Sequence, residues 1–151
     1  DVYGQIVLST VQAFFDERLF RPATVEDFCS LEPIGDRAFE LHDKPDASLW
    51  EFRGRENVHT YSAVMCWAAC DRLGNAAAKL GLADRADFWN DRAATVRATI
   101  EEKAWNKDLG RFAATFGGDE LDLLGRIRIR YHAAFSEDIN HIKECFAIRS
   151  L

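Results

Sequence analysis

The residue of this sequence best placed for acid–base chemistry is a glutamate between two aromatic residues, Glu51 in the stretch Trp50-Glu51-Phe52. A carboxylic acid that protonates a leaving group at neutral pH needs a raised pKa, and partial desolvation by aromatic surface supplies it. Arg53 in contact with Glu51 would favour the ionised carboxylate, so we expect its side chain to point elsewhere, toward a substrate hydroxyl. The face of Trp50 suits packing against the C–H face of a sugar ring. The stretch favours carbohydrate chemistry.

A surface ion pair is the alternative interpretation of the same residues. Glu51 is flanked by Arg53 and Arg55, and on spacing alone such an arrangement is more often a solvated charge pair of small energetic value. The spacing by itself leaves both interpretations open.

Helices on both sides must position this stretch. Apolar residues recur at helical spacing in four segments, 5–19, 24–41, 60–80 and 84–105. Turn-forming residues separate the second segment from the third and give a connector over residues 45–59. The sequence predicts an all-α fold.

Two residues complicate the second of these helices. Thr24 is a good N-cap, with Asp27 three residues further on. Within the helix, however, Pro33 and Gly35 are expected to bend or split it.

The third and fourth helices differ in how their apolar residues are distributed. Those of 60–80 face almost every direction, which indicates burial on all sides, and Gly81 follows as a C′ residue. Those of 84–105 form a single stripe through Trp89, Val96 and Ile100, with charged residues opposite. An inner helix followed by an outer antiparallel helix is the unit of helical double layers. No fixed-period repeat is detectable, which favours a closed α/α barrel over a solenoid.

The remainder of the chain is predicted from local chemistry. Residues 105–118 combine turn residues with a short alternating run and predict a small β-like hairpin or an extended loop. Residues 120–135 and 137–148 are interpreted as two further helices.

Composition limits the classes of partner. The 151 residues are 48% hydrophobic and 29% charged, as expected of one globular domain. A net charge of -6 argues against a nucleic-acid partner. The sequence shows no apolar run of membrane-spanning length and no signal peptide, so we expect a cytoplasmic protein with no membrane partner.

The cysteines are too few for a disulfide scaffold. Cys29, Cys66, Cys70 and Cys145 are interpreted as free thiols, and no metal ligand is assigned. A metal site built from Cys66, Cys70, His141 and Cys145 is the alternative, and it requires two distant helices to meet.

Three stretches carry a family resemblance. Residues 45–73, PDASLWEFRGRENVHTYSAVMCWAACDRL, resemble a Trp-Glu-x-Arg-Gly to Met-Cys-Trp block in the bacterial branch of glycoside hydrolase family fifteen, the glucoamylase and trehalase-like enzymes. The opening DVYG is similar to a Gln-x-Asp-x-Tyr-Gly segment of that family. FWNDRAATVRATIEEKAWNKDLGRF and FGGDELD resemble its later helix and turn, so the resemblance extends over 1–122.

The resemblance implies a fold, a reaction and a set of site residues. The fold is an (α/α)6 barrel, a six-hairpin toroid with its active site in loops at one end. The reaction is inverting hydrolysis of α-glucosidic bonds by two carboxyl groups about 6.5 to 9.5 Å apart. Glu51 matches the general acid, Leu49 and Trp50 match positions that line the glucosyl pocket, and Arg53 and Asp1 match residues near it. No cofactor is implied.

Several positions depart from the family pattern. Ser48 and Ala63 replace the usual glycine and lysine, and the family's histidine and following aromatic correspond to Val58 and His59. Residues 123–151 lose the pattern, because three arginines stand where leucines are expected. These are Arg126, Arg128 and Arg130.

Length is the largest departure. A closed barrel needs roughly twelve helices, about twice what this chain holds or more. The resemblance therefore predicts a single fragment, residues 1–151, of a catalytic barrel, with 45–59 as its active-site loop and no match to the catalytic base.

The fragment interpretation carries three expectations. The parent acts on maltooligosaccharides, trehalose or another α-glucoside, whereas the chain alone is inactive. Its uncovered edges are expected to cause self-association. The alternative is a truncated or degenerate helical module that binds sugar or protein without catalysis.

Overall fold

A computed structural model describes residues 1–19, 21–47 and 57–120. The chain divides into two compact units, Asp1–Asp119 and Glu120–Leu151. The helices predicted over 120–135 and 137–148 fall almost entirely outside the described residues, so both stay predictions.

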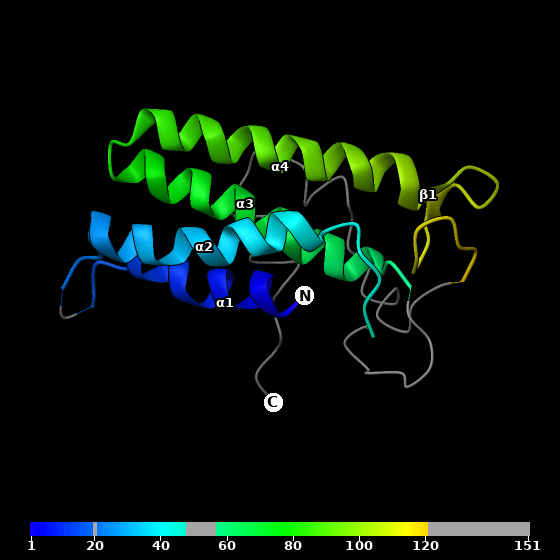
Figure 1. The fold of residues 1–151 in the computed structure, drawn as a ribbon, viewed down its shortest axis with the longest axis horizontal. Coiled ribbons are helices and arrows are strands. Elements are labelled where there is room, and N and C mark those ends of the chain that lie inside the picture. The colour runs from blue at the N-terminus through cyan, green and yellow to red at the C-terminus, as the bar shows by residue number, and fades with distance from the viewer. Residues whose placement is uncertain (20, 48–56, 121–151) are drawn as a thin grey trace. The chain divides into compact units, whose positions relative to one another are not determined.

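The first unit is built from two helical hairpins (Figure 1). The first hairpin consists of α1 (Val2–Val11), continued by the 3₁₀ turn η1 (Gln12–Phe14), and α2 (Val25–Leu41). The second consists of α3 (Thr60–Lys79) and α4 (Ala83–Ala104). α1 and α3 run in one direction, and α2 and α4 run in the opposite direction. The all-α prediction is confirmed.

The third predicted helix has the burial expected of an inner helix. Fourteen of the twenty residues of α3 are buried, because α1, α2 and α4 all pack against it. A Cβ on Gly4 of α1 would lie 2.5 Å from the Met65 carbonyl oxygen of α3. A Cβ on Gly74 would lie 2.4 Å from Oδ1 of Asn90 in α4. Glycine thus permits close approach of α3 to a neighbour on two sides.

The fourth helix buries one stripe, as predicted. The buried residues of α4 recur every three or four positions and face α3, while the acidic residues Asp91, Glu101 and Glu102 are exposed. The turn that joins the two helices is tight, and Gly81 has φ 76, a conformation that glycine adopts without steric cost. The buried stripe is Ala86, Trp89, Ala93, Val96, Ile100 and Ala104.

The first helix differs from its predicted bounds. It begins at Val2 rather than Gln5, and the α-helix ends at Val11, where a single 3₁₀ turn carries the chain to Phe14. Val7, Val11 and Phe14 still form the buried stripe, but Phe15 is 39% exposed. Packing on α3 preserves the stripe and does not require the helix to continue.

Pro33 and Gly35, which were expected to bend or split the second helix, do not split it. α2 is continuous. Pro33 has no amide hydrogen to donate to the carbonyl of Cys29, but both residues lie on the exposed side of the helix, so water can solvate that carbonyl. The predicted start is confirmed. Thr24 and Asp27 form a reciprocal capping box.

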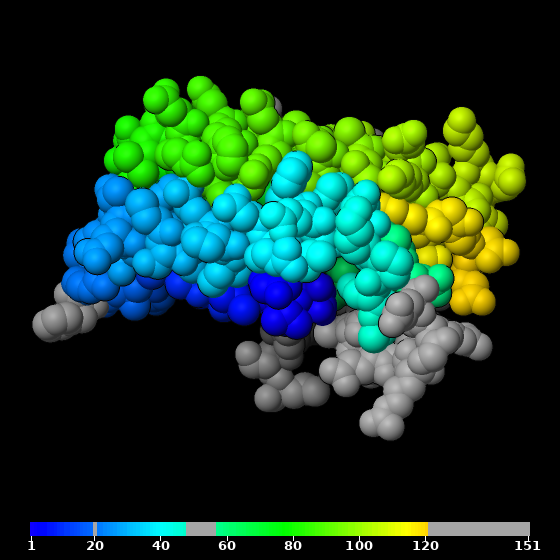
Figure 2. Space-filling model, in the orientation of Figure 1, coloured from blue at the N-terminus to red at the C-terminus, as the bar shows by residue number. Residues whose placement is uncertain are grey.

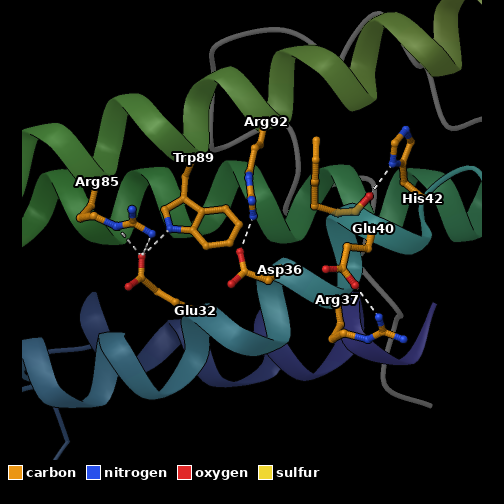
Figure 3. A network of polar contacts seen from close by, with 9 residues as sticks. Glu32, Asp36, Arg37, Glu40, His42, Arg85, Trp89 and Arg92 are labelled. Atoms are coloured by element: carbon orange, nitrogen blue, oxygen red, sulfur yellow. Dashed lines mark hydrogen bonds and ion pairs between the residues drawn. The ribbon is translucent and has the colours of Figure 1, made fainter.

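Polar contacts join the two outer helices, α2 and α4 (Figure 3). Oε1 of Glu32 accepts hydrogen bonds from Nε of Arg85 at 2.7 Å and from Nε1 of Trp89 at 2.8 Å. Trp89 is fully buried and the Glu32 side chain is 18% exposed, so this carboxylate satisfies an indole N–H that has no access to water. Glu32 thereby fixes α2 against α4 near the Gly81 turn.

A second contact follows one turn along the same helices. Arg92 of α4 pairs with Asp36 of α2, and its guanidinium lies 4.6 Å from the ring centroid of Phe39 and 4.2 Å from that of Phe88. Cation–π attraction adds to the ion pair here. In the space-filling view, α2 and α4 adjoin along this seam (Figure 2).

The chain after α4 forms the predicted small hairpin. β1 (Trp105–Asn106) pairs antiparallel with β2 (Arg111–Phe112), and the rings of Trp105 and Phe112 meet edge to face at 5.0 Å. Gly110 has φ 61 just before β2. The hairpin extends from the end of α4 at which α3 begins.

The close approach at Gly35 gives the first prediction. An added Cβ would lie 2.2 Å from Cδ1 of Leu73 and 2.7 Å from Cη2 of Trp89, and both of these side chains are fully buried. Gly35→Ala should therefore lower the free energy of unfolding by about 1–3 kcal/mol, despite the better helix propensity of alanine. Urea unfolding followed by circular dichroism measures it.

Ser30→Ala is the matched control, because Ser30 is exposed on the same helix. We expect it to change stability by less than about 0.5 kcal/mol. Gly35→Ala as stable as the original chain would contradict this packing of α2.

Candidate active site

One end of the helical layers gathers segments that are distant in the sequence. α1 begins there, α2 ends there, α3 begins there and α4 ends there, with the hairpin beside them (Figure 1). The residues that flank the predicted active-site loop are at this end, because that loop joins α2 to α3. The arrangement agrees with a site at one end of the layers.

A backbone bridge holds the two ends of that loop together. Asp46 and Asn57 form an isolated antiparallel pair, in which the Asp46 amide donates to the Asn57 carbonyl at 2.9 Å and the Asn57 amide donates to the Asp46 carbonyl at 3.3 Å. We call this pair the neck. These two hydrogen bonds join the chain before residue 47 to the chain after residue 56.

The chain after the neck is fixed by the segment that follows the hairpin. His59 forms an antiparallel bridge with Thr115, and the Phe116 amide donates to the Val58 carbonyl at 2.9 Å. Thr60 is 2% exposed. Its hydroxyl donates to the Ala113 carbonyl at 2.7 Å, and its amide donates to the Ala114 carbonyl. The first residue of α3 is therefore tied to the hairpin segment by side chain and backbone.

Asp1 is beside the neck. Its amino nitrogen lies 3.8 Å from Oδ2 of Asp46, and its side chain is 14% exposed. Oδ2 of Asp1 accepts a hydrogen bond from Nε2 of Gln5 at 2.8 Å.

Burial raises the pKa of Tyr61, and a hydrogen bond with Gln5 partly opposes that rise. Asp1, Gln5 and Tyr61 therefore form a half-buried polar row along the start of α1 and α3, a chemistry suited to a hydroxyl-rich ligand.

A histidine stands across the neck from the same aspartate. Nε2 of His59 lies 4.0 Å from Oδ1 of Asp46, and the two side chains are 14% and 31% exposed. In the sequence His59 was only a departure from a family pattern, and neither Gln5 nor Tyr61 was predicted as a site residue. The i, i+4 spacing of Asp1 and Gln5 in a helix was the one available signal for that contact.

Of the predicted site residues, only Asp1 is among the residues that the structure describes. Asp1 lies beside the neck, and its role at a site stays a prediction. Glu51, Leu49, Trp50 and Arg53 are outside the described residues, and their roles stay predictions.

The thiols of α3 have properties of buried groups. Burial raises the pKa of Cys66 to about 11 and that of Cys70 to about 12, so both are protonated at neutral pH. Cys29 is exposed, and all three are free. Within residues 1–19, 21–47 and 57–120, His, Cys, Asp and Glu form no group of three that could hold a metal ion. The alternative metal site also required His141 and Cys145, which are outside these ranges.

Sequence comparison identifies the family. Residues 1–138 match the family described as Glycosyl hydrolases family 15. This match extends over most of the chain, so the protein belongs to that family. The described helices alternate between an inner and an outer layer, and they are accordingly part of an all-α toroid.

Several curated relatives are similar to this chain. A trehalase of Thermoplasma volcanium is 33% identical over 78 residues, which are 52% of this chain and 12% of the relative. Trehalase 2 of Sulfolobus acidocaldarius is 30% identical over 95 residues, 63% of this chain and 16% of the relative. A trehalase of Mycobacterium tuberculosis is 35% identical over 79 residues, 52% of this chain and 12% of the relative. The aligned part therefore spans 12–16% of each of these enzymes, as expected of a fragment of a larger enzyme.

No solved structure matches the chain significantly. Among the described residues, no helix combines the length and apolar character needed to cross a membrane.

The link between α3 and the hairpin segment gives the second prediction. Thr60→Val keeps the side-chain volume but removes the buried hydroxyl that bonds the Ala113 carbonyl, so the free energy of unfolding should fall by about 1–3 kcal/mol. Thr95→Val is the matched control, because Thr95 is exposed and its hydroxyl bonds only its own helix.

Chemical denaturation of both variants measures the difference. The control should lie within about 0.5 kcal/mol of the original chain. Equal stability of the two variants would contradict the role assigned to the Thr60 hydroxyl.

Proposed function

We propose that this chain is the acid-bearing part of a glycosidase that hydrolyses an α-glucosidic bond with inversion, and that Glu51 is the general acid. The observation that carries the proposal is the neck. It brings both ends of the loop that contains Glu51 to the end of the layers where Asp1 lies. Family membership supplies the reaction class.

Inverting hydrolysis divides the work between two carboxyl groups. The acid protonates the glycosidic oxygen while a base on the opposite face of the sugar activates a water, and a separation of about 6.5–9.5 Å leaves room for that water. In this proposal Glu51 is the acid, and the Trp50 face and Leu49 line the glucosyl pocket. Arg53 and Asp1 bind substrate hydroxyls. This chemistry needs only two carboxyl groups and water, so no cofactor is proposed.

The base belongs to a part of the parent enzyme that this chain does not match. We therefore propose that the 151 residues alone do not catalyse the reaction. The alternative hypothesis is a truncated or degenerate helical module that binds sugar or protein without catalysis.

Trehalose is the first candidate substrate. The curated relatives described above carry the name trehalase, and this supports trehalose ahead of maltooligosaccharides. We propose the cytoplasm as the location. Neither nucleic acid nor membrane is proposed as a partner.

The general acid gives the third prediction. In the parent enzyme, Glu51→Gln should lower kcat for trehalose by about 100-fold to 10,000-fold, because the amide has no proton to give to the leaving group. Far-UV circular dichroism should not change. Glucose release measured by a coupled assay gives kcat.

Glu102→Gln is the matched control, since Glu102 is exposed on α4 and far along the chain from the loop. It should retain full activity. Full activity in Glu51→Gln would exclude Glu51 as the acid, whatever the substrate.

The face of α1 gives the fourth prediction. Val2 and Ile6, one helical turn apart, are 60% and 39% exposed, and Tyr3 is 38% exposed beside them. We propose that in the parent a further helix of the toroid covers this face, because an inner helix has neighbours on both sides. In the isolated chain a second copy takes that place, and the chain dimerises.

Sedimentation velocity tests this self-association. Ile6→Glu should shift the chain to monomer. Val25→Glu places the same charge on a similarly exposed residue at the start of α2 and should leave the dimer intact. A monomeric original chain with no binding of an apolar dye would contradict the proposed edge.

A further inference from the structure

We propose that Ser62 is a further substrate-binding residue, and that the start of α3 binds a hydroxyl group of the sugar through the Ser62 side chain and the amides of Tyr61 and Ser62. The identity of the ligand as a sugar rests on the proposed function. The site itself consists of described residues at the start of α1 and α3.

Ser62 carries a buried hydroxyl without a partner. The residue is 8% exposed, and in the part of the chain that the structure describes its Oγ is the one buried side-chain nitrogen or oxygen without a hydrogen bond. Such a hydroxyl has lost its hydrogen bonds to water and gained none in return, so it destabilises the unliganded fold. An uncompensated buried group is uncommon in folded proteins, and binding sites are where it is expected.

The first turn of α3 presents unbonded backbone amides beside that hydroxyl. The Thr60 amide donates to the hairpin segment, and the Ala63 amide donates to the His59 carbonyl. Within the described residues the amides of Tyr61 and Ser62 have no acceptor, and the N-cap residue His59 makes no side-chain cap. N–H groups at a helix N-terminus favour an oxygen acceptor.

Helix geometry directs the Ser62 side chain toward the same turn. In an α-helix each Cα–Cβ bond tilts toward the N-terminus, and Ser62 is the third residue of α3. A rotation between staggered rotamers about that bond can turn the hydroxyl to a ligand at the helix end. The hydroxyl and the two N–H groups are therefore placed to bind one ligand.

The side of α3 that carries Ser62 faces the start of α1. Met65 and Cys66 are three and four residues further on and share this side of the helix. The Met65 carbonyl lies against Gly4, and the Cys66 thiol is influenced by the amino group of Asp1. Because the two helices run in the same direction, Ser62 lies one turn before this contact, at the level of Asp1.

The groups around this turn favour a neutral ligand rich in hydroxyl groups. The carboxylates of Asp1 and Asp46 are at this end of the layers, and both would repel an anion. The polar row of Asp1, Gln5 and Tyr61 supplies carboxylate, amide and phenol groups, which match the donors and acceptors of sugar hydroxyls. A glucosyl ring is therefore favoured over phosphate at the start of α3.

Titration of the full 151-residue chain with trehalose, followed by two-dimensional NMR, tests the site. Trehalose should shift the amide resonances of Tyr61 and Ser62, whereas sorbitol, an open-chain polyol, should not. In Ser62→Ala the dissociation constant for trehalose should rise about three- to tenfold, as expected for the loss of one hydrogen bond between neutral groups.

Thermal unfolding of the same variant separates a binding role from a structural one. Ser9→Ala is the matched control, because the Ser9 hydroxyl is exposed on α1 and bonds the Ile6 carbonyl of its own helix at 2.9 Å. It accounts for the better helix propensity of alanine and should leave the affinity for trehalose unchanged. Since the Ser62 hydroxyl has no partner in the unliganded chain, Ser62→Ala should raise the unfolding temperature by about 2–4 °C more than the control does.

Several results would overturn the assignment. Amides of Tyr61 and Ser62 that trehalose does not shift would do so, as would an unchanged affinity in Ser62→Ala. A lower unfolding temperature in Ser62→Ala would show that the hydroxyl has a structural partner such as a bound water. Inorganic phosphate that shifts the two amides when trehalose does not would assign the helix end to an anion instead.

This outcome is separate from that of the proposed function. An active Glu51→Gln enzyme would remove Glu51 as the acid and leave the trehalose titration unchanged. Amides that trehalose does not shift would remove Ser62 from the site and leave Glu51 as the acid.

Discussion

Burial of α3 on all sides is the constraint on which the rest of the described structure depends. A helix that is apolar all round needs neighbours on every face, and α1, α2 and α4 supply them. Small residues permit the close approach, since Gly4 lies against the Met65 carbonyl and Gly35 lies against Leu73 and Trp89. Side-chain burial and backbone proximity therefore fix the same arrangement.

The position of the candidate site follows from that packing. Because α1 and α3 run side by side in one direction, both begin at one end of the layers, and Asp1 lies beside Asp46, which follows α2. The neck of Asp46 and Asn57 joins this part of the chain to the segment that enters α3. The neck and the ends of the helices thus fix the chain on either side of the predicted active-site loop. The Glu32 and Asp36 contacts hold α2 against α4 further along the layers, toward the Gly81 turn.

Helix periodicity predicted much of this fold. The distinction between α3 and α4 was visible in the sequence because burial on all sides and burial of one stripe give different patterns of apolar residues. Pro33 misled the prediction for α2, since the cost of a proline depends on whether the freed carbonyl meets water, and the sequence does not show which side faces solvent. The bounds of α1 were also wrong, because apolar spacing does not distinguish an α-helix from a helix that ends in a 3₁₀ turn.

The candidate site was less predictable than the fold. Asp1 was found through a family motif, whereas the contact of His59 with Asp46 depends on the backbone bridge that closes a loop, and no local pattern in the sequence encodes that bridge. The roles of Glu51 and its neighbours rest on resemblance and family membership.

The stereochemistry of the first products tests the central claim, that this chain carries the acid of an inverting glycosidase, most directly. Proton NMR of trehalose hydrolysis by the parent enzyme, recorded before mutarotation, distinguishes the two outcomes. Inversion at one anomeric carbon gives equal amounts of α-glucose and β-glucose, and this is the result that the account predicts. Formation of α-glucose alone would show retention and contradict it.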